Sequence, residues 1–280
     1  MIYLLEHYGF CNGVKNSIEI LIKARKENKG VTLLHPLMHN DIEVEKLQNE
    51  YHFRTGKDAM LSNDAIVFSA HGHTKEEEEK YHSHPFYDAI CPILKKRYEI
   101  LNQKKDLKWY FLGKKNHQET ISFLSHFPGL TFIDSEAKEF PELNQEQTGL
   151  IVQSTISEEI TKEYESYFRN NTSLIAYIPP CPVYLARKQE AIDFFKTHDS
   201  RTFDIIVLGS KTSSNCNELK ESLKKLYPYC NILKANTIND IDMSLLDKEN
   251  ILLVSSTSIS KDSVDAIYDY LVKSRGRQIF

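Results

Sequence analysis

Short apolar runs of strand length alternate with longer segments of helical pattern along this chain. The apolar runs occupy residues 3–5, 31–34, 65–68, 109–112, 149–152, 175–178, 204–208 and 251–254. Helical segments follow several of these runs, at residues 41–50, at residues 75–80, from residue 158 and from about residue 262. Strands and helices that alternate in this way form parallel sheets with helices on their faces. The pattern therefore predicts an α/β protein.

The same order of features recurs along the chain, and each repeat ends in a cysteine. Cys11, Cys91 and Cys181 each follow an apolar run and precede a helical segment. The last repeat stops before its third strand and cysteine, and the missing piece, residues 2–11, stands at the other end of the chain. We therefore predict three similar small α/β domains. Their boundaries are residues 12–91, residues 92–181, and residues 182–280 completed by residues 1–11, with no linker between them.

The overall composition excludes several classes of protein. Of the 280 residues, 41% are hydrophobic, and the net charge of −4 offers no basic field to nucleic acid or acidic lipid. No apolar run reaches about 18 residues, and the N-terminus lacks the features of a signal peptide. The five cysteines are an odd number and form no Cys-x-x-Cys pair. We expect a cytoplasmic protein with no disulfide framework, no membrane partner and no nucleic-acid partner.

The repeated cysteines suggest a metal centre. Parallel sheets bind ligands at the carboxyl ends of their strands, so three such ends facing one another would form a central pocket. Three thiolates suit zinc or an iron–sulfur cluster, but structural zinc usually uses closely spaced cysteine pairs. Three thiolates on a four-iron cluster would leave one iron open for catalysis. Cys216 and Cys230 are instead interpreted as small core residues.

Histidines and one polar turn are candidates for anion binding. His39, His71 and His117 each come just after a strand, which favours a ligand role over simple surface exposure. The turn at residues 209–215 leads from a strand into a helix N-terminus, where N–H groups and hydroxyls suit phosphate. Plain N-capping by serine or asparagine is the alternative. The turn lacks the Gly-x(4)-Gly-Lys-Ser/Thr pattern, so an NTPase is not expected.

Glu119 is a candidate acid or base. It lies two residues after His117, as in the His-x-Glu motif of zinc deaminases, but Pro180-Cys181 is not followed by the second cysteine that this signature needs. A carboxylate on the wall of the pocket could exchange protons with a ligand. A solvated glutamate at a helix start is the alternative interpretation.

Several of these segments together resemble the LytB family, the 4-hydroxy-3-methylbut-2-enyl diphosphate reductases of isoprenoid synthesis. The matching segments are Gly9-Phe10-Cys11-Asn12-Gly13-Val14, Met38-His39-Asn40, Phe68-Ser69-Ala70-His71-Gly72, Asp88-Ala89-Ile90-Cys91-Pro92, His117-Gln118-Glu119 and Gly209-Ser210-Lys211-Thr212-Ser213-Ser214-Asn215. They fall in the family's order and span essentially the whole chain. No single segment is specific to the family, but the six segments together are.

The resemblance implies a trefoil of three α/β domains around a [4Fe-4S] cluster. It implies a two-electron reductive dehydroxylation that yields isopentenyl and dimethylallyl diphosphate, with electrons from a ferredoxin or flavodoxin. The implied cluster ligands are Cys11, Cys91 and Cys181. The implied diphosphate-binding residues are His39, His71, His117, Ser213, Ser214 and Asn215. The implied proton donor is Glu119, and the family's Thr-Thr pair corresponds to Ser154-Thr155, which we group with Glu119 as catalytic.

Other segments depart from the family pattern. Residues 182–188 replace a threonine-bearing turn that leads to Arg-Gln, and Lys114 stands where the family has histidine. The family's Gly-Ala-Ser-Ala-Pro is replaced by residues 257–261, which places its phosphate-contacting serine on or beside Ile259. Ser258 and Ser260 are the possible substitutes, and we take Ser258 as the candidate. A reductase for another allylic alcohol, and a non-catalytic iron–sulfur or anion-binding redox sensor, are the alternative functions.

Overall fold

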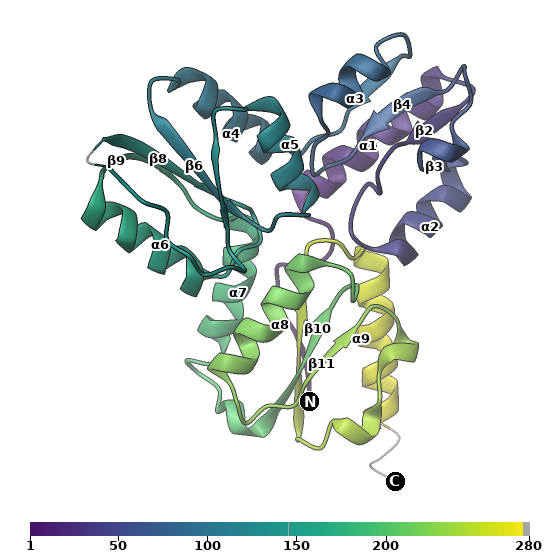
Figure 1. Ribbon diagram of the computed structural model, residues 1–280. Coiled ribbons are helices and arrows are strands. Elements are labelled where there is room, and N and C mark those ends of the chain that lie inside the picture. The colour runs from purple at the N-terminus through teal and green to yellow at the C-terminus, as the bar shows by residue number, and fades with distance from the viewer. Residues whose placement is uncertain (145, 277–280) are drawn as a thin grey trace. The chain divides into compact units, whose positions relative to one another are not determined.

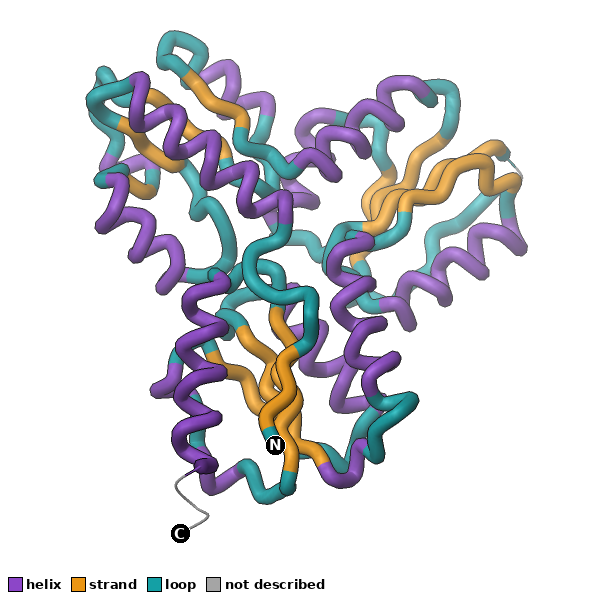
Figure 2. Tube along the Cα trace, turned by 180° about the vertical axis from the view of Figure 1, so that it is seen from behind, coloured by secondary structure: helices purple, strands orange, loops and turns teal. Residues whose placement is uncertain are grey.

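The computed structural model describes residues 1–144 and 146–276, shown as a ribbon in Figure 1 and as a Cα tube in Figure 2. Within these residues the strands form three four-stranded sheets, and the strand pairs are parallel. The expected α/β class with parallel sheets is therefore confirmed. The central strands of each sheet are continuous apolar runs because helices cover both of their faces.

We name the sheets by their place in the sequence. The N-terminal sheet contains β2 (Val31–Leu33), β3 (Arg54–Thr55), β4 (Ala65–Phe68) and β5 (Phe86–Asp88). The middle sheet contains β6 (Lys108–Gly113), β7 (Thr131–Asp134), β8 (Gln147–Val152) and β9 (Ser173–Ile178). The C-terminal sheet contains β10 (Phe203–Leu208), β11 (Ile232–Ala235), β12 (Asn250–Ser255) and β1 (Ile2–Leu4).

The strand order is the same in every sheet. It runs β3-β2-β4-β5, β7-β6-β8-β9 and β11-β10-β12-β1, so the second strand of each repeat lies at one edge and the fourth at the other. β1 pairs with β12, with Ile2 opposite Ile251, and Figure 2 shows the N-terminal strand beside the others of its sheet. The predicted repeat, completed by the N-terminal strand, is confirmed. The apolar runs missed one strand in each sheet, namely β3, β7 and β11, and in the N-terminal sheet also β5, which only the position of Cys91 indicated.

The helices connect successive strands. They are α1 (Asn12–Glu27), α2 (Asp41–Tyr51), α3 (Lys75–Lys80), α4 (Pro92–Gln103), α5 (Gln118–His126), α6 (Glu158–Asn171), α7 (Pro182–Phe194), α8 (Ser214–Leu226) and α9 (Lys261–Gly276). Short 3-10 turns lie at η1 (Lys57–Ala59), η2 (Ser200–Thr202), η3 (Ile238–Asp240) and η4 (Met243–Leu245). Several start signals are local: Ser157 caps α6, and Thr74 with Glu77 forms a capping box on α3.

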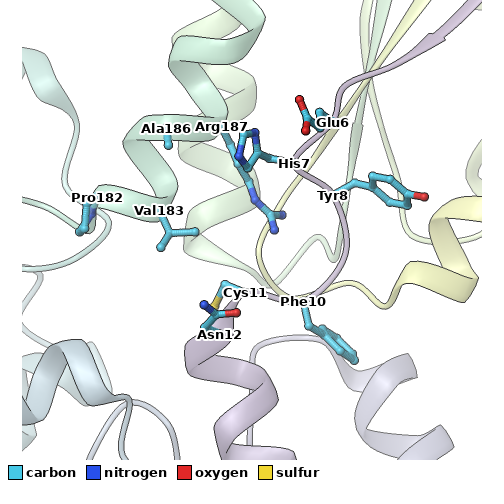
Figure 3. A pocket seen from close by; sticks show the side chains of 10 residues that line it. All are labelled: Glu6, His7, Tyr8, Phe10, Cys11, Asn12, Pro182, Val183, Ala186 and Arg187. Carbon is cyan, nitrogen blue, oxygen red and sulfur yellow. The ribbon is translucent and has the colours of Figure 1, made fainter.

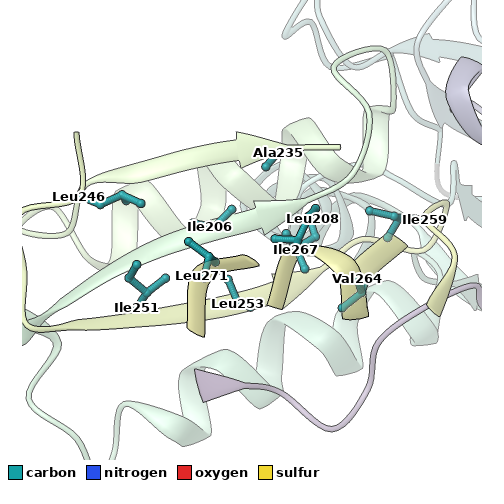
Figure 4. Close-up of a cluster of buried hydrophobic side chains, with 10 residues drawn as sticks. All are labelled: Ile206, Leu208, Ala235, Leu246, Ile251, Leu253, Ile259, Val264, Ile267 and Leu271. Atoms are coloured by element: carbon teal, nitrogen blue, oxygen red, sulfur yellow. The ribbon is translucent and has the colours of Figure 1, made fainter. Parts of the chain in front are cut away.

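Each sheet builds its core from alternating side chains. In the middle sheet, Trp109 and Phe111 pack with residues of α4 and α5, whereas Tyr110 and Leu112 pack with α6 on the opposite face. This follows from the two-residue period of a strand. In the C-terminal sheet, residues of β10 and β12 pack against the apolar face of α9 (Figure 4).

The described chain divides into two compact units. Unit 1 comprises Met1–Val14, Met38–Glu50 and Pro182–Phe280, and unit 2 comprises Lys15–Leu37 and Tyr51–Cys181. Residues 277–280, which the predicted third domain includes, lie outside the described residues. The N-terminal and middle sheets belong to unit 2, and the C-terminal sheet belongs to unit 1. The predicted three-domain boundaries stay a prediction, and the site residues are described below within their own unit.

Candidate functional site

The three cysteines of the repeat occupy equivalent turns. Cys91 lies between β5 and α4, Cys181 between β9 and α7, and Cys11 between β1 and α1. The backbone N–H of each cysteine donates to the carbonyl two residues past the third strand of its own sheet. The acceptors are Ala70 (3.0 Å), Ser154 (3.0 Å) and Thr257 (3.2 Å), in that order. The repeat therefore extends to the hydrogen bonds that hold the cysteines.

A second set of hydrogen bonds holds the carbonyl two residues before each cysteine. The donor in each case lies six residues after a different cysteine. The pairs are Arg97 Nη2 to Pro179 O (2.7 Å), Arg187 Nη2 to Gly9 O (2.6 Å) and Ser17 Oγ to Ala89 O (2.7 Å). Each helix that begins at a cysteine thus holds the turn of another cysteine by a hydrogen bond: α1 holds the Cys91 turn, α4 the Cys181 turn and α7 the Cys11 turn.

Arg97 and Arg187 are functional candidates that the sequence interpretation missed. Both are charged, yet they are only 3% and 5% exposed. Each also donates to the carbonyl at the end of the third strand of a sheet, at 2.9 and 3.1 Å. Their common offset of six residues from Cys91 and Cys181 is the signal that could have found them.

The remaining cysteines lie in different surroundings. Cys216 and Cys230 are 0% and 8% exposed, and burial raises the pKa of each thiol to about 11. Their thiols therefore stay protonated at neutral pH, which makes them poor metal ligands. Cys11, Cys91 and Cys181 are all partly exposed instead. The contrast agrees with the interpretation of Cys216 and Cys230 as core residues.

In unit 2, Glu119 is held in a buried network. It is the second residue of α5 and is fully buried. Ser154 donates to it twice, from Oγ to Oε2 at 2.5 Å and from the backbone N–H to Oε1 at 3.1 Å. Arg97 Nη1 donates to Oε1 at 3.1 Å. The backbone carbonyl of Ser154 also accepts the N–H of Cys181. The same residue therefore holds both the Glu119 carboxyl group and the turn of a candidate cluster ligand.

The environment of Glu119 favours its protonated form. Burial raises the pKa of this carboxyl, and the Arg97 charge and the two Ser154 hydrogen bonds offset only part of the increase. A carboxyl group with a raised pKa holds a proton at a pH where an exposed glutamate has lost it. Glu119 is thus suited to act as a proton donor.

His117 is a neutral hydrogen-bond donor at the start of α5. Its Nδ1 accepts the backbone N–H of Glu119 (3.2 Å), so the proton of the neutral ring lies on Nε2. Burial, with a smaller effect from the charge of Lys114, lowers the pKa of His117 to about 4. His71 lies edge-on to this ring, with 6.0 Å between the ring centroids.

The turn that carries His71 is fixed to α5. Gly72 has a φ of 91°, and a Cβ there would stand 2.3 Å from Ser122 Oγ, so only glycine allows this approach. Gln118 Nε2 donates to the carbonyl of Gly72 at 3.3 Å. Unit 2 therefore brings His71 and His117 together although they come from different sheets.

Thr155 is oriented by a glutamine that the sequence interpretation missed. Gln153 is fully buried, and its Nε2 donates to the hydroxyl oxygen of Thr155 at 2.9 Å. Its Oε1 accepts the backbone N–H of Lys114 at 2.8 Å. Gln153 therefore ties the end of β8 to the loop that leads to His117.

In unit 1, the predicted anion-binding turn meets Ser258. Ser213 caps α8 by accepting the N–H of Cys216 (3.3 Å), and Ser258 Oγ donates to Ser213 Oγ at 3.4 Å. Ile259 points into the core beside α9, and Ser260 Oγ donates to Glu43 at 3.0 Å. Of the two serines that the sequence left open, Ser258 is the one beside Ser213.

Asn215 and His39 complete the candidates of unit 1. Asn215 is 9% exposed, and its Oδ1 has no hydrogen-bond partner among the described residues. Ser214, beside it, is half-buried. His39 precedes Asn40, whose Nδ2 donates to the carbonyl of Ser258 at 2.8 Å. Unit 1 thus joins the His39 turn, Ser258 and the start of α8 through direct contacts.

Cys11 also borders a pocket of unit 1. The pocket has a volume of about 460 Å³ (Figure 3). It is lined by Glu6, His7, Tyr8, Phe10, Cys11, Asn12, Pro182, Val183, Ala186 and Arg187. Cys11 therefore borders open space on one side.

The sequence and the fold both have known counterparts. A family model described as LytB protein matches residues 2–272. The chain belongs to the LytB family. The 4-hydroxy-3-methylbut-2-enyl diphosphate reductase of Dictyoglomus thermophilum is 27% identical to it, over 97% of this chain and 96% of the relative. The enzyme of the same name from Aquifex aeolicus is 28% identical over 81% of each chain.

A solved structure shows the same fold. The structure of the E-1-hydroxy-2-methyl-but-2-enyl-4-diphosphate reductase from Plasmodium falciparum superposes with a TM-score of 0.79, at 23% identity, over 97% of this chain and 87% of that one. These matches confirm the resemblance to LytB proteins and the expected class, a reductase of this family. Among residues 1–144 and 146–276, none of the helices has the length and apolar character needed to cross a membrane.

Proposed function

We propose that this LytB protein is an iron–sulfur reductase that converts 4-hydroxy-3-methylbut-2-enyl diphosphate to isopentenyl and dimethylallyl diphosphate. The names of its relatives supply the substrate. The buried network around Glu119 carries the proposal, because it offers a proton donor next to a neutral imidazole and one of the cysteine turns. A sensor would have no use for such a proton donor.

The residues present fit a [4Fe-4S] cluster held by Cys11, Cys91 and Cys181. The three thiols share one turn geometry and are partly exposed, whereas the other two are buried and protonated. Such a cluster, when bound, supplies electrons and one iron that is open to a substrate oxygen. The hydrogen bonds from Arg97, Arg187 and Ser17 hold the cysteine turns in place for it.

Glu119 supplies a proton to the leaving hydroxyl. The overall change consumes two electrons and two protons: the C–O bond breaks, a C–H bond forms, and the oxygen leaves as water. Hydroxide is a poor leaving group, so its oxygen must be protonated as the C–O bond breaks. Ser154 Oγ, at 2.5 Å from Glu119, extends the proton path, and Thr155 stands next to it.

Hydrogen-bond donors from two helix starts and from histidine turns would bind the diphosphate. His117 offers Nε2–H, and His39 and His71 would add further imidazoles. The start of α8 offers Ser213, Ser214 and Asn215 together with its helix N-terminus, and Ser258 lies against Ser213. The N–H groups of Asn215 Nδ2 can donate to the anion, and its unpartnered Oδ1, which only accepts, would be satisfied by a water molecule beside the ligand.

The electron donor we propose is a ferredoxin or flavodoxin, in the cytoplasm. The decisive experiment is anaerobic turnover with the diphosphate and a chemical reductant. We expect both products, and no turnover of the matching alcohol. Turnover of a different allylic alcohol would identify the first alternative, and an intact cluster without turnover of any allylic diphosphate would identify the sensor.

Cluster content tests the ligand set separately. Protein purified without oxygen should contain about four irons per chain. Cys11→Ser, Cys91→Ser and Cys181→Ser should each abolish the cluster. Cys216→Ser and Cys230→Ser are the matched controls and should keep the iron. Stoichiometric zinc in place of iron in anaerobic preparations would contradict the proposal.

A further inference from the structure

Three ligand-type side chains meet in unit 2, away from the cysteine turns. His73 precedes α3, Glu78 lies within it, and His126 is the last residue of α5. Nε2 of His73 lies 2.7 Å from Oε1 of Glu78, and Nε2 of His126 lies 3.6 Å from the same oxygen. The three ligand atoms all lie within 4.8 Å of one another.

Hydrogen bonds fix the orientation of His126. Its Nδ1 lies 2.9 Å from the carbonyl of Ser122. Because a carbonyl oxygen only accepts, Nδ1 carries the proton, and the lone pair of the neutral ring is on Nε2. A metal-binding histidine usually donates its other N–H in this way. Ser122 Oγ also donates to the backbone carbonyl of His73 at 2.7 Å and so holds the main chain there, whereas Nδ1 of the His73 ring has no hydrogen-bond partner among the described residues.

The burial and the charges of the cluster suit a cation. His73 is 5% exposed and stacks on Phe68 at 3.8 Å, whereas the side chain of Glu78 is 45% exposed. One side of the cluster therefore opens to solvent and leaves room for a water ligand. His126 stands at the C-terminus of α5, where the partial negative charge of the helix favours a cation.

We propose that His73, Glu78 and His126 form a binding site for Zn²⁺ or a similar divalent cation. Two imidazole nitrogens and one carboxylate oxygen suit zinc, with water in the fourth position, whereas Ca²⁺ and Mg²⁺ prefer oxygen ligands. Zinc–ligand distances of about 2.0–2.2 Å place tetrahedral ligands roughly 3.4 Å apart. To reach this spacing, both Glu78 and the imidazole rings have to shift, since the ligand atoms lie 2.7 and 3.6 Å from the carboxylate oxygen and within 4.8 Å of one another. The bound ion would join α3 to α5.

The test is zinc binding by the cluster-containing protein under anaerobic conditions, after weak chelation removes adventitious metal. We expect one zinc per chain at this site and a rise in the thermal midpoint, since a ligand that binds only the folded state stabilises it. Glu78→Gln and His126→Ala should each weaken zinc binding by about 100-fold or more. Glu78→Gln preserves the size of the side chain and guards against a folding defect.

Two neighbours on the same segment provide controls. Glu79→Gln and His82→Ala change exposed residues next to the site and should bind zinc like the unchanged protein. Iron content should be the same in all variants. X-ray absorption of the bound zinc should show nitrogen and oxygen ligands only. A sulfur shell, equal zinc affinity in His126→Ala, or no zinc bound by the unchanged protein would overturn the proposal.

Discussion

The starts of α5 and α8 occupy the same place in two repeats and differ in charge. Each helix follows the first strand of its sheet, β6 or β10, and each is capped by a candidate ligand, His117 or Ser213. Two residues past the cap stands Glu119 in one helix and Asn215 in the other, and both are buried. One position of the fold thus carries an acid in unit 2 and an amide in unit 1.

The two helix starts differ because a buried carboxylate and a buried amide need different partners. A buried carboxylate needs compensation, and Glu119 has both Arg97 and Ser154. A buried amide needs no counter-charge, so Asn215 can offer the N–H groups of Nδ2 to an anion, while its unpartnered Oδ1 can accept from water. The start of α5 is therefore suited to move protons and the start of α8 to bind an anion. Each prediction below acts on one side of this comparison.

Removing the counter-charge should have the largest effect. Arg97→Met leaves Glu119 buried without its cation, which typically costs about 3–5 kcal/mol of stability. The pKa of Glu119 rises further in this variant. A raised pKa in the folded state means that stability falls as pH rises, so the loss should be larger at pH 8 than at pH 5. The thermal midpoint of the anaerobic holoprotein, measured at both pH values, checks this.

Two further variants sharpen the Arg97 prediction. Arg169→Met removes an exposed arginine paired with Glu165 and should change stability by less than about 0.5 kcal/mol. The double variant Arg97→Met/Glu119→Gln removes both charges and should recover part of the loss. An unchanged midpoint in Arg97→Met would contradict the role given to this pair.

Neutralising the acid should affect catalysis without affecting binding. Glu119→Gln preserves size and hydrogen-bonding capacity, so fold, iron content and diphosphate affinity should remain. Turnover should fall by about 10²-fold or more, the scale of a positioned general acid. Steady-state kinetics with a direct binding measurement separate the two quantities. If Glu119→Gln turned over near the original rate, the proton would have to come through Ser154, Thr155 or a substrate phosphate oxygen instead.

Removing the amide should affect binding without affecting catalysis. Asn215→Ala deletes the hydrogen bond that we propose from this amide to the diphosphate, and such a bond to a charged ligand is worth roughly 1.5–3 kcal/mol, or about 10- to 100-fold in affinity. Turnover at saturating substrate should change little. Asn217→Ala alters a half-buried amide on the same helix that bonds to Lys211 and Lys234, and it serves as the control. An equal loss in both variants would rule out a specific role for Asn215.

The smallest expected effect, per pH unit, is the dependence of kcat/KM on pH. In the proposed mechanism Glu119 donates a proton, so kcat/KM should fall tenfold per pH unit above the pKa of this residue, which lies above its ordinary value of 4.5. The residual activity of Glu119→Gln should lack this decline. His117, with a pKa of about 4, stays neutral across the same range and adds no transition near pH 6.5. A profile that declines identically in both proteins would assign the titration to another group.

The central strands that the sequence located are buried on both faces. β4, β10 and β12 are fully buried, so their apolar runs are continuous and easy to find. β3, β7 and β11 are short and lie at the sheet edge, and most of their residues are only partly buried. Their mixed composition carries no comparable signal, because edge strands are held by pairing with one neighbour rather than by apolar burial.

The sequence by itself determined the repeat, the cysteine positions and the helix starts, since each of these depends on residues close together in the chain. Glycine, serine and histidine at strand ends mark the candidate ligands without reference to the fold. The partners of Glu119 were decided only in three dimensions: Arg97 is 22 residues away and Ser154 is 35 residues away. The contact between Ser258 and Ser213, which are 45 residues apart, was also decided only by the tertiary structure. Long-range packing sets the protonation of Glu119 and the partners of these side chains, because burial and neighbouring charge are properties of the folded chain.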